Sequence, residues 1–263
     1  MISKYSDESK IWVLIWTDNN MQEVFVKQVN LRVELTIMAK TSLSLSVVMI
    51  TRNEEKAVAG VIDDIKQNVP AETEILIVDS SSDRTADIAR RKGARVLVQL
   101  PPKGYGPAMM RALTEASGDI VITLDADNTY PAEYIPKLVG WAGKGFEVIN
   151  ASRLRGKPKS MPWINYLANM TTAILASVLY GKWTTDLHSG MRMYRKKVLR
   201  ELAFNPNGPA LPVDLWLKPI LYKYKTKEIF IPYKIRIGES KMNPLPGLYW
   251  TLRRIILTRL GKS

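Results

Sequence analysis

The sequence predicts an α/β fold with a mostly parallel central sheet. Between residues 43 and 151, short apolar runs typical of buried strands alternate with longer segments typical of helices, which is the pattern of βαβ units. Residues suited to helix ends separate these segments: Asp83 as an N-cap, Gly93 as a C-terminal stop and Pro131 in a first turn. The predicted strands are 45–51, 74–78, 95–99, 119–124 and 146–151, and the predicted helices are 54–68, 84–92, 107–117 and 131–142.

The α/β pattern belongs to a main domain over residues 38–245, which a segment precedes. Within residues 1–37, the apolar run 11–16 is too short to span a bilayer and follows acidic residues, unlike a signal peptide, while residues 29–35 alternate as in a half-buried strand. Met38 stands directly before the α/β pattern. We therefore favour a start of translation at Met38, with 1–37 an extension or a mis-assigned start; the alternative is an amphipathic hairpin.

Two further segments have the character of interface helices. Residues 161–183 are the most apolar stretch, and Asn165 and Asn169, one helical turn apart, give it a polar stripe. We favour a helix lying in an interface, with a membrane-spanning helix and an ordinary core helix as alternatives. Residues 246–263 interleave apolar residues with three arginines, which predicts a basic amphipathic helix with affinity for a membrane surface.

The composition excludes several chemistries. The chain has no cysteine, so it can form neither a disulfide nor a thiolate metal site, and its one histidine, His188, excludes a multi-histidine metal cluster. The net charge of +13 and the pI near 9.8 indicate an anionic partner. No zinc-finger spacing, ribonucleoprotein motif or helix-turn-helix is readable, so we expect no nucleic acid as the partner.

Polar residues follow three of the predicted strands. Thr51 to Glu54 follow the first strand, Asp79 the second, and Asp125 to Asp127 the fourth. The carboxyl ends of such strands gather at one edge of a sheet, where ligands bind. An Asp-x-Asp triplet alone is equally typical of a solvated turn, but here a buried strand delivers both carboxylates to one place. Hard oxygen ligands at this spacing suit Mg²⁺ or Mn²⁺ bridging a diphosphate.

From about residue 45 to residue 241, the chain resembles family 2 glycosyltransferases of the GT-A (Rossmann-like) fold. Within that family it is most similar to dolichyl-phosphate mannose synthases and related polyprenyl-phosphate glycosyltransferases. The resemblance rests on ordered motifs: Val-Val-Met-Ile-Thr-Arg-Asn-Glu-Glu from 47, Val-Asp-Ser-Ser-Ser-Asp-Arg-Thr from 78, Lys-Gly-Tyr-Gly-Pro-Ala from 103, Leu-Asp-Ala-Asp from 124, Ala-Ser-Arg from 151, Asp-Leu-His-Ser-Gly-Met-Arg from 186 and Arg-Ile-Gly-Glu-Ser-Lys from 236.

This resemblance implies a role for residues of each motif. It implies that Asp125 and Asp127 hold the metal, with Ala126 between them at the diphosphate. As a hypothesis, Arg153 and Arg192 would hold an acceptor phosphate, because the planar arginine fork suits that geometry. The remaining substrate-binding positions that the resemblance implies are Thr51, Arg52, Glu54, Asp79, Lys103, Ser189, Arg236 and Lys241, and the catalytic ones are Asp127, Asp186 and Arg153.

The chain also departs from the family pattern. In the first motif Ile50 replaces a proline and Arg52 an aromatic residue, so the nucleotide base cannot be carried over from relatives. Thr129 stands where mannosyl enzymes often have glutamine, and Met191 stands where an aromatic residue follows Ser-Gly. A second arginine after the Ala-Ser-Arg motif has no counterpart, although substitute charge is available from Arg155, Lys157 and Lys159.

Together, these features predict an inverting glycosyltransferase that depends on Mg²⁺ or Mn²⁺. It would move mannose or glucose from GDP-mannose or UDP-glucose to a polyprenyl (dolichyl) phosphate. A monoester phosphate has a second pKa of about 6 and is a dianion near neutral pH, so it needs no general base. We accordingly expect a structural role for His188.

Two alternatives stay open, one an enzyme and one not. The first is transfer to a soluble acceptor such as 3-phosphoglycerate, and the second is a non-catalytic basic protein that binds anions or nucleic acid; the intact Asp-x-Asp argues against the second. For the favoured reading we expect a cytoplasmic protein, associated peripherally with the cytoplasmic face of a membrane.

Overall fold

The computed structural model describes residues 12–17, 20–25, 43–158, 161–237 and 244–262. Its centre is a seven-stranded sheet with the strand order β5-β4-β3-β6-β8-β7-β9. The strands are β3 (Leu45–Thr51), β4 (Glu74–Asp79), β5 (Arg95–Val98), β6 (Ile120–Thr123), β7 (Val148–Ser152), β8 (Arg192–Arg195) and β9 (Thr226–Phe230). All neighbours pair in parallel except β8, which is antiparallel to both β6 and β7.

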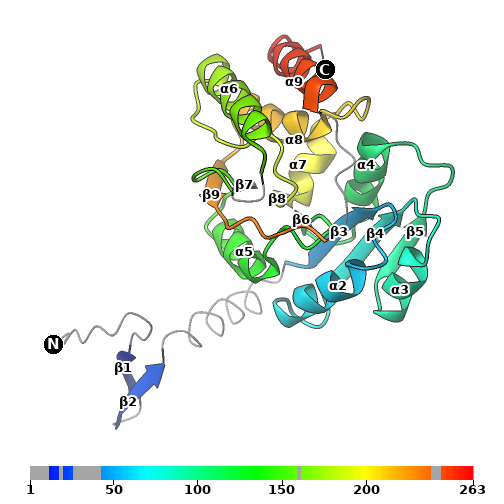
Figure 1. Ribbon diagram of the computed structural model, residues 1–263. Helices are drawn as coiled ribbons and strands as arrows, with labels where there is room; N and C mark the ends of the chain where they lie inside the picture. The colour runs from blue at the N-terminus through cyan, green and yellow to red at the C-terminus, as the bar shows by residue number, and fades with distance from the viewer. Residues whose placement is uncertain (1–11, 18–19, 26–42, 159–160, 238–243, 263) are drawn as a thin grey trace.

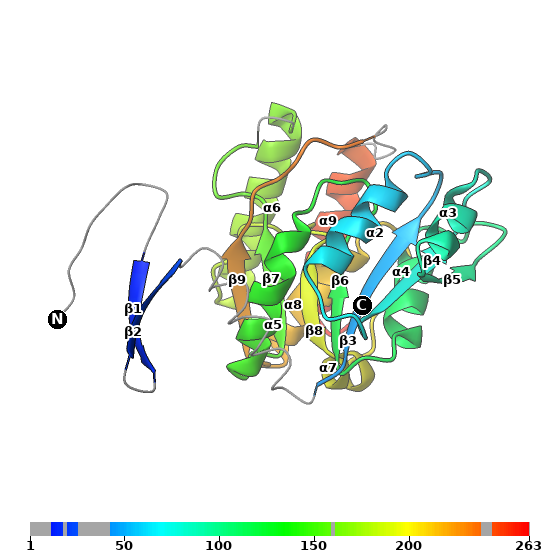
Figure 2. The ribbon, with the colours of Figure 1, turned by 90° about the horizontal axis from the view of Figure 1, so that it is seen from below.

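Helices cover both faces of this sheet (Figures 1 and 2). One face packs against α2 (Val58–Gln67), α3 (Thr85–Arg91), η1 (Ala132–Tyr134) and α5 (Ile135–Gly143). The other packs against α4 (Tyr105–Glu115), α6 (Trp163–Tyr180), α7 (Lys196–Glu201), α8 (Leu211–Leu221) and α9 (Pro244–Arg259).

The two layers explain why β3 is a continuous apolar run. Val47 and Met49 belong to one core cluster and Val48 to the other, because successive side chains point to opposite faces of a sheet. A parallel strand buried on both faces is apolar throughout rather than alternating. The predicted α/β class and mostly parallel sheet are therefore confirmed.

The element ends agree with the sequence signals in part. Gly93, with φ +80°, follows α3, and Ala94 N–H donates to the carbonyl of Ala89 across the helix end. At the other end of α3, the N-cap is Arg84 and not Asp83, although the Asp83 carboxylate, one residue earlier, accepts the N–H of Thr85 at 2.9 Å. Pro131 differs slightly, since it lies just before η1 rather than inside the first turn.

The elements between residues 192 and 230 were not predicted from the sequence. β8 is only four residues long and begins and ends with arginine, so it lacks the apolar run of the other strands. α8 carries Pro219 inside the helix and buries Asp214 and Lys218. These two charged residues can be buried because they pair with each other, but a search for apolar periodicity does not detect such a helix.

α6 packs on the rest of the domain with its large apolar side chains facing outward. Its inner face is small or hydroxylated, with Thr172, Ala173, Ala176 and Ser177 buried. Its outer face exposes large apolar side chains, among them Trp163 at 64% and Val178 at 76% exposure. No helix among the described residues combines the length and apolar character that crossing a bilayer requires. The exposed outer face of α6 differs from that of an ordinary core helix.

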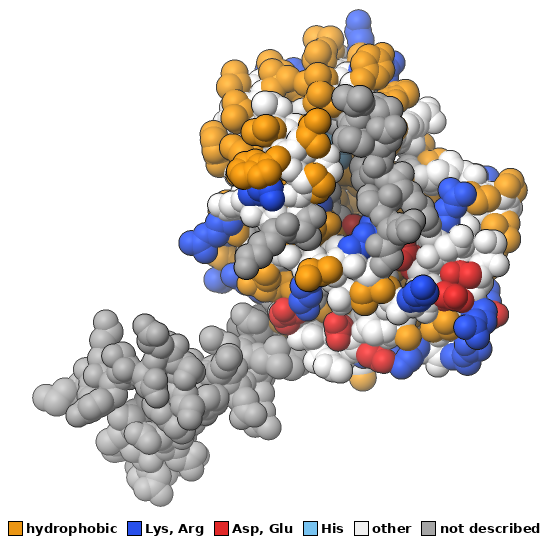
Figure 3. Space-filling view, in the orientation of Figure 1, with side chains coloured by type: hydrophobic (Ala, Val, Ile, Leu, Met, Phe, Trp, Pro, Cys, Tyr) orange, Lys and Arg blue, Asp and Glu red, His pale blue; other side chains and the backbone are white. Residues whose placement is uncertain are grey.

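α9 packs beside α6 and against α8, and it corrects one sequence expectation. Arg254 was counted among the cations of a membrane-facing surface, but it is 2% exposed and pairs with Asp214 at 2.8 Å. Arg253 and Arg259 are exposed, as are Tyr249 and Ile256. Figure 3 shows hydrophobic side chains gathered over α6 and the neighbouring α9.

Near the N-terminus, β1 (Trp12–Thr17) and β2 (Asn20–Phe25) form an antiparallel hairpin with Thr17 opposite Asn20. It lies within residues 1–37, for which the sequence offered an amphipathic hairpin as the alternative interpretation. Met38 and the strand expected at 29–35 lie outside the described residues. The division of the chain at residues 37 and 245 stays a prediction.

Candidate active site

Asp127 follows the carboxyl end of β6, and Thr129 and Arg236 hold its carboxylate. Its Oδ1 accepts the N–H of Thr129 at 3.1 Å and the Thr129 hydroxyl at 2.5 Å. Its Oδ2 pairs with Nη1 of Arg236 at 2.8 Å. The side chain is only 6% exposed, so its orientation is held by these contacts.

Asp125 lies against the Ser189-Gly190 turn. Burial raises the pKa of the Asp125 carboxyl to about 7, and the negative charge of Asp127 adds to this rise. A Cβ on Gly190 would meet Oδ2 of Asp125 at 2.6 Å, which is closer than real contacts allow. The Gly190 N–H donates to the Tyr130 hydroxyl at 2.6 Å, which fixes the turn. The glycine of this motif is therefore required by the close approach of Asp125.

Arg236 joins the metal motif to the first-strand motif. Besides Asp127, it pairs through Nη2 with Oε1 of Glu54 at 3.2 Å. The chain leading to it is fixed, because Lys234 N–H donates to Thr129 O and Ile237 N–H donates to Asp127 O, both at 2.9 Å. Its Nε is buried without a hydrogen-bond partner. Lys241, expected to act with Arg236, lies outside the described residues.

The donor set at the strand ends fits a hard divalent cation that takes further ligands from a substrate. Within residues 43–158, 161–237 and 244–262, no group of three or more Asp, Glu, His or Cys side chains could hold a metal. Asp125 and Asp127 supply carboxylate oxygens, and Mg²⁺ characteristically binds through one or two carboxylates plus substrate phosphates. The residues present therefore fit a metal that binds together with a diphosphate.

Arg153 and Asp186 form a buried bidentate pair. Nε and Nη2 of Arg153 donate to the two carboxylate oxygens at 2.7 and 2.9 Å, and the Arg153 backbone N–H adds a third bond at 3.2 Å. Burial alone would raise the pKa of Asp186, but the charge and hydrogen bonds of Arg153 hold it below its usual range. The pair stays ionised, and the Arg153 side chain is 10% exposed.

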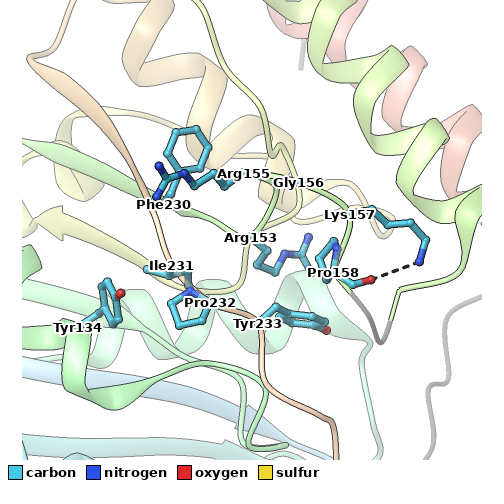
Figure 4. Close-up of a pocket in the computed structure, with 10 residues that line it drawn as sticks. All are labelled: Tyr134, Arg153, Arg155, Gly156, Lys157, Pro158, Phe230, Ile231, Pro232 and Tyr233. Carbon is cyan, nitrogen blue, oxygen red and sulfur yellow. Dashed lines mark hydrogen bonds between the residues drawn. The ribbon is translucent and has the colours of Figure 1, made fainter. Parts of the chain in front are cut away.

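Beside this pair lies a pocket of about 360 Å³ (Figure 4). Arg153, Arg155 and Lys157 bring three cations to it, and Figure 4 shows Arg153 beside the ring of Tyr233, 5.2 Å from its guanidinium carbon. The Lys157 ammonium lies 5.1 Å from the ring of Trp163, the first residue of α6. The basic pocket therefore adjoins the exposed apolar face of α6.

The structure corrects the expectation for Arg192. This residue is 1% exposed, and its guanidinium donates to Asn150 Oδ1 at 2.7 Å, to Leu187 O at 2.7 Å and to Pro212 O. All these partners are protein oxygens in the core, so Arg192 braces the chain around residue 187 and does not face a phosphate. Ser189 is likewise buried, and its hydroxyl donates to Ala151 O at 2.5 Å.

Other expected donor-side residues lie along the same sheet edge. Asp79 is 2% exposed and accepts hydrogen bonds from the hydroxyls of Thr51 and Ser81, both at 2.6 Å. Arg52 is exposed after β3, and Lys103 is exposed before α4. Contact of these residues with a nucleotide stays a prediction.

Three residues near the site were missed by the sequence reasoning. Tyr130 and Tyr233 flank the Arg153 guanidinium, and Glu228 accepts hydrogen bonds from the segment before Asp186, including Thr185 N–H at 2.9 Å. Tyr233 and Glu228 approach the site only through the pairing of β9 with β7, which local sequence does not reveal. Tyr130 follows Asp127 by three residues, and this proximity was the available signal.

His188 has the structural role expected for it. Burial lowers the pKa of its imidazole to about 4, so the ring is neutral near pH 7. Its Nε2 lies 2.8 Å from Oγ1 of Thr251. The Thr251 hydroxyl donates to Gly247 O at 2.7 Å, so it accepts from His188, whose ring carries the proton on Nε2.

A mostly parallel seven-stranded sheet with an Asp-x-Asp after its central strand is the arrangement of a GT-A glycosyltransferase, and the solved structures described below share this fold. The chain belongs to glycosyl transferase family 2, whose model matches residues 46–203.

Relatives within the family are named for lipid-phosphate acceptors. The chain is 39% identical over 203 residues to a dolichyl-phosphate hexose transferase of Haloferax volcanii, which covers 77% of this chain and 88% of the relative. It is 28% identical to a dolichol-phosphate mannosyltransferase of Pyrococcus furiosus, covering 76% of this chain and 59% of that protein.

Solved structures share the fold. A glucosyl-3-phosphoglycerate synthase of Mycobacterium tuberculosis, crystallised with Mn²⁺, UDP-glucose and phosphoglyceric acid, superposes with a TM-score of 0.68 at 26% identity. The match covers 88% of this chain and 83% of the synthase.

Proposed function

We propose that the protein is an inverting, metal-dependent glycosyltransferase that moves a hexose from a nucleotide-diphosphate sugar to a polyprenyl phosphate. The observation that carries this proposal is the position of Arg153. On one side its guanidinium carbon lies 6.0 Å from the ring of Tyr130, whose hydroxyl bonds the Gly190 turn that contacts Asp125. On the other side Arg153 lines the basic pocket. An acceptor phosphate on Arg153 would therefore lie beside the metal motif, where the sugar of the donor is expected.

The donor side is supported by Asp125, Asp127 and Arg236. The two carboxylates would hold Mg²⁺ or Mn²⁺, which supplies positive charge to the departing diphosphate when it is bound. The Arg236 Nε–H, buried without a partner, offers a further donor for a diphosphate oxygen. Mn²⁺ in the crystals of the glucosyl-3-phosphoglycerate synthase supports a divalent ion in this fold. GDP-mannose and UDP-glucose are the donors we expect.

The chemistry does not require a protein base. An oxygen of the acceptor phosphate dianion attacks the anomeric carbon, a carbon–oxygen bond forms, and the bond to the diphosphate breaks with its electron pair on the leaving oxygen. In-line attack inverts the configuration. His188 is not suited to act as the base. Its Nε2 already carries a proton, which it donates to Thr251, and burial lowers the pKa of the imidazole to about 4, so the ring is a weak base. Arg153 would bind and orient the attacking phosphate through Nη1, because its Nε and Nη2 are engaged by Asp186.

A lipid-borne phosphate is favoured by the junction between the pocket and α6. Lys157 contributes to the pocket and contacts the Trp163 ring at 5.1 Å. From Trp163 the exposed apolar face of α6 continues to Val178. A phosphate in the pocket could thus carry its polyprenyl tail directly onto this face, with the enzyme resting peripherally on the cytoplasmic face of a membrane.

Transfer to a soluble phosphorylated acceptor is the second candidate. It is favoured by the likeness to the glucosyl-3-phosphoglycerate synthase over 88% of this chain. The exposed apolar face of α6 has no use in that reaction, which is why we place it second.

One assay separates the candidates. Purified protein with Mg²⁺ or Mn²⁺ is given labelled GDP-mannose or UDP-glucose, with polyprenyl phosphate in vesicles or 3-phosphoglycerate in solution. Label in an acid-labile lipid supports the first candidate, and label only in a soluble product supports the second. Asp127→Asn is expected to abolish transfer, whereas the matched change Asp87→Asn on exposed α3 is not. Unchanged activity in Asp127→Asn would refute the metal site.

A further inference from the structure

Among the described residues, a side-chain bond joins helix α9 to the acceptor side of the site. Thr251, on the inner face of α9 and 2% exposed, accepts a hydrogen bond from His188 Nε2 at 2.8 Å. These two residues are far apart in sequence, and the bond joins the C-terminal helix to the segment that follows Asp186.

The same segment holds the Asp186 carboxylate. The His188 backbone N–H donates to Asp186 Oδ1 at 3.0 Å, and that oxygen also accepts Nη2 of Arg153 at 2.9 Å. One carboxylate oxygen of Asp186 therefore accepts hydrogen bonds from both His188 and Arg153. A shift of residue 188 changes where Asp186 holds the Arg153 guanidinium.

α9 is a firm support for this bond. Nη1 of Arg254 donates to Asp214 Oδ2 at 2.8 Å, and the other Asp214 oxygen accepts the Thr258 hydroxyl. The Tyr180 hydroxyl of α6 donates to Ile255 O at 2.9 Å. These contacts are buried or part-buried and lie one to two turns beyond Thr251, so they fix α9 against both α8 and α6.

The opposite face of α9 is exposed and largely apolar. Tyr249, Ile256 and Leu260 are exposed there, next to Arg253. The helix thus has an outer face beside that of α6 and an inner face bonded to the acceptor side.

We propose that Thr251 and His188 are positioning residues for the acceptor, holding the Asp186–Arg153 pair in place so that α9 is a working part of the acceptor site. This inference rests on the proposed binding of an acceptor phosphate by Arg153. The side-chain hydrogen bonds of both residues lie on the acceptor side, so we expect the larger effect on the acceptor.

The test removes one hydroxyl without changing the shape of the helix. Thr251→Val leaves the His188 Nε2–H buried without an acceptor, while Thr251→Ser keeps the hydroxyl. Because the unpaired His188 donor no longer holds residue 188 against α9, we expect KM for polyprenyl phosphate to rise about tenfold in Thr251→Val. KM for the nucleotide sugar should stay within about twofold of its original value, and Thr251→Ser should behave like the unmodified protein.

Thr114→Val is the matched control, because Thr114 is an exposed residue near the C-terminal end of α4, a helix that contributes neither to the acceptor side nor to the outer face of α6. It should change neither KM. If Thr251→Val folds poorly, the pair His188→Gln and His188→Leu repeats the comparison, since glutamine retains a donor near the position of Nε2 and leucine does not.

Two results would overturn the inference: an unchanged acceptor KM in Thr251→Val, or a loss of kcat with both KM values unaltered, which marks a purely structural role. Failure of the proposed function looks different. In that case the unmodified protein itself transfers no sugar to polyprenyl phosphate, and Arg153→Lys has no acceptor effect to compare.

Discussion

At the scale of single residues, Asp125 depends on the absence of a side chain opposite it. Its carboxylate fills the space where a Cβ on Gly190 would lie, at 2.6 to 2.8 Å. The carboxylate is buried on one side by this turn and faces Asp127 on the other, and both facts raise its pKa to about 7. The cation binding that we propose for Asp125 therefore depends on local packing as much as on the chemistry of its carboxylate.

Gly190→Ala is expected to displace Asp125 and to abolish most activity. Overpacking of this kind destabilises a core by about 1–3 kcal/mol, so the melting temperature should fall. Gly140→Ala is the control, because a Cβ there meets nothing within 4 Å and Gly140 lies inside α5, where alanine is the better helix former. Initial rates and thermal unfolding of both variants test this, and full activity in Gly190→Ala would contradict the observed approach.

His188 makes stability depend on pH in a defined direction. Burial lowers its pKa from 6.5 to about 4 in the folded protein. The unfolded chain therefore binds more protons between these values, so the stability that neutral His188 contributes is present above pH 6.5 and is lost as the pH falls toward 4. Relative to His188→Gln, which does not titrate, the unmodified protein should lose melting temperature over that window. Parallel melting curves from pH 7.5 to pH 4 would disprove the assignment.

At the scale of elements, α6 inverts the usual pattern of a surface helix. A helix of a globular protein normally turns its apolar stripe toward the core. Here alanine, serine and threonine face the body, while Trp163, Leu167 and Val178 face outward. Small inner residues let the helix lie close to the body, and the outer residues form a surface that favours an apolar partner.

Replacing two outer residues of α6 should remove vesicle binding without unfolding the protein. Leu167→Gln with Val178→Gln changes side chains that are 55% and 76% exposed, so stability should change by less than about 0.5 kcal/mol per site. Flotation with lipid vesicles should show reduced binding. Val98→Gln on the sheet edge, a side chain 43% exposed, is the control and should float like the unmodified protein. Equal flotation of all three proteins would remove the membrane role of α6.

At the scale of the whole molecule, the elements that local sequence determines could be predicted, and those that depend on contacts between distant parts of the chain could not. The five strands from β3 to β7 are apolar runs whose local sequence specifies them, and the position of Asp125 and Asp127 followed from the strand before them. β8 and β9 depend on pairing with distant strands, and their charged residues interrupt the apolar pattern by which a strand is predicted. Arg192 was misjudged for a related reason, because an arginine that satisfies buried carbonyls has the same sequence as one that binds phosphate.

The charge of the whole chain predicts how the proposed membrane contact responds to lipid and salt. The net charge is +13, and exposed Arg253 and Arg259 lie beside the apolar residues of α9. Apolar contact is insensitive to salt, whereas attraction to anionic headgroups is screened over about 8 Å at physiological ionic strength. Binding should therefore be stronger to anionic than to neutral vesicles and should fall in high salt to the level measured with neutral vesicles, because the α6 surface persists. Arg253→Gln should weaken only the anionic component. Binding that is equal for both lipids at low salt would contradict a contribution of charge, and complete loss in high salt would contradict the contribution of α6.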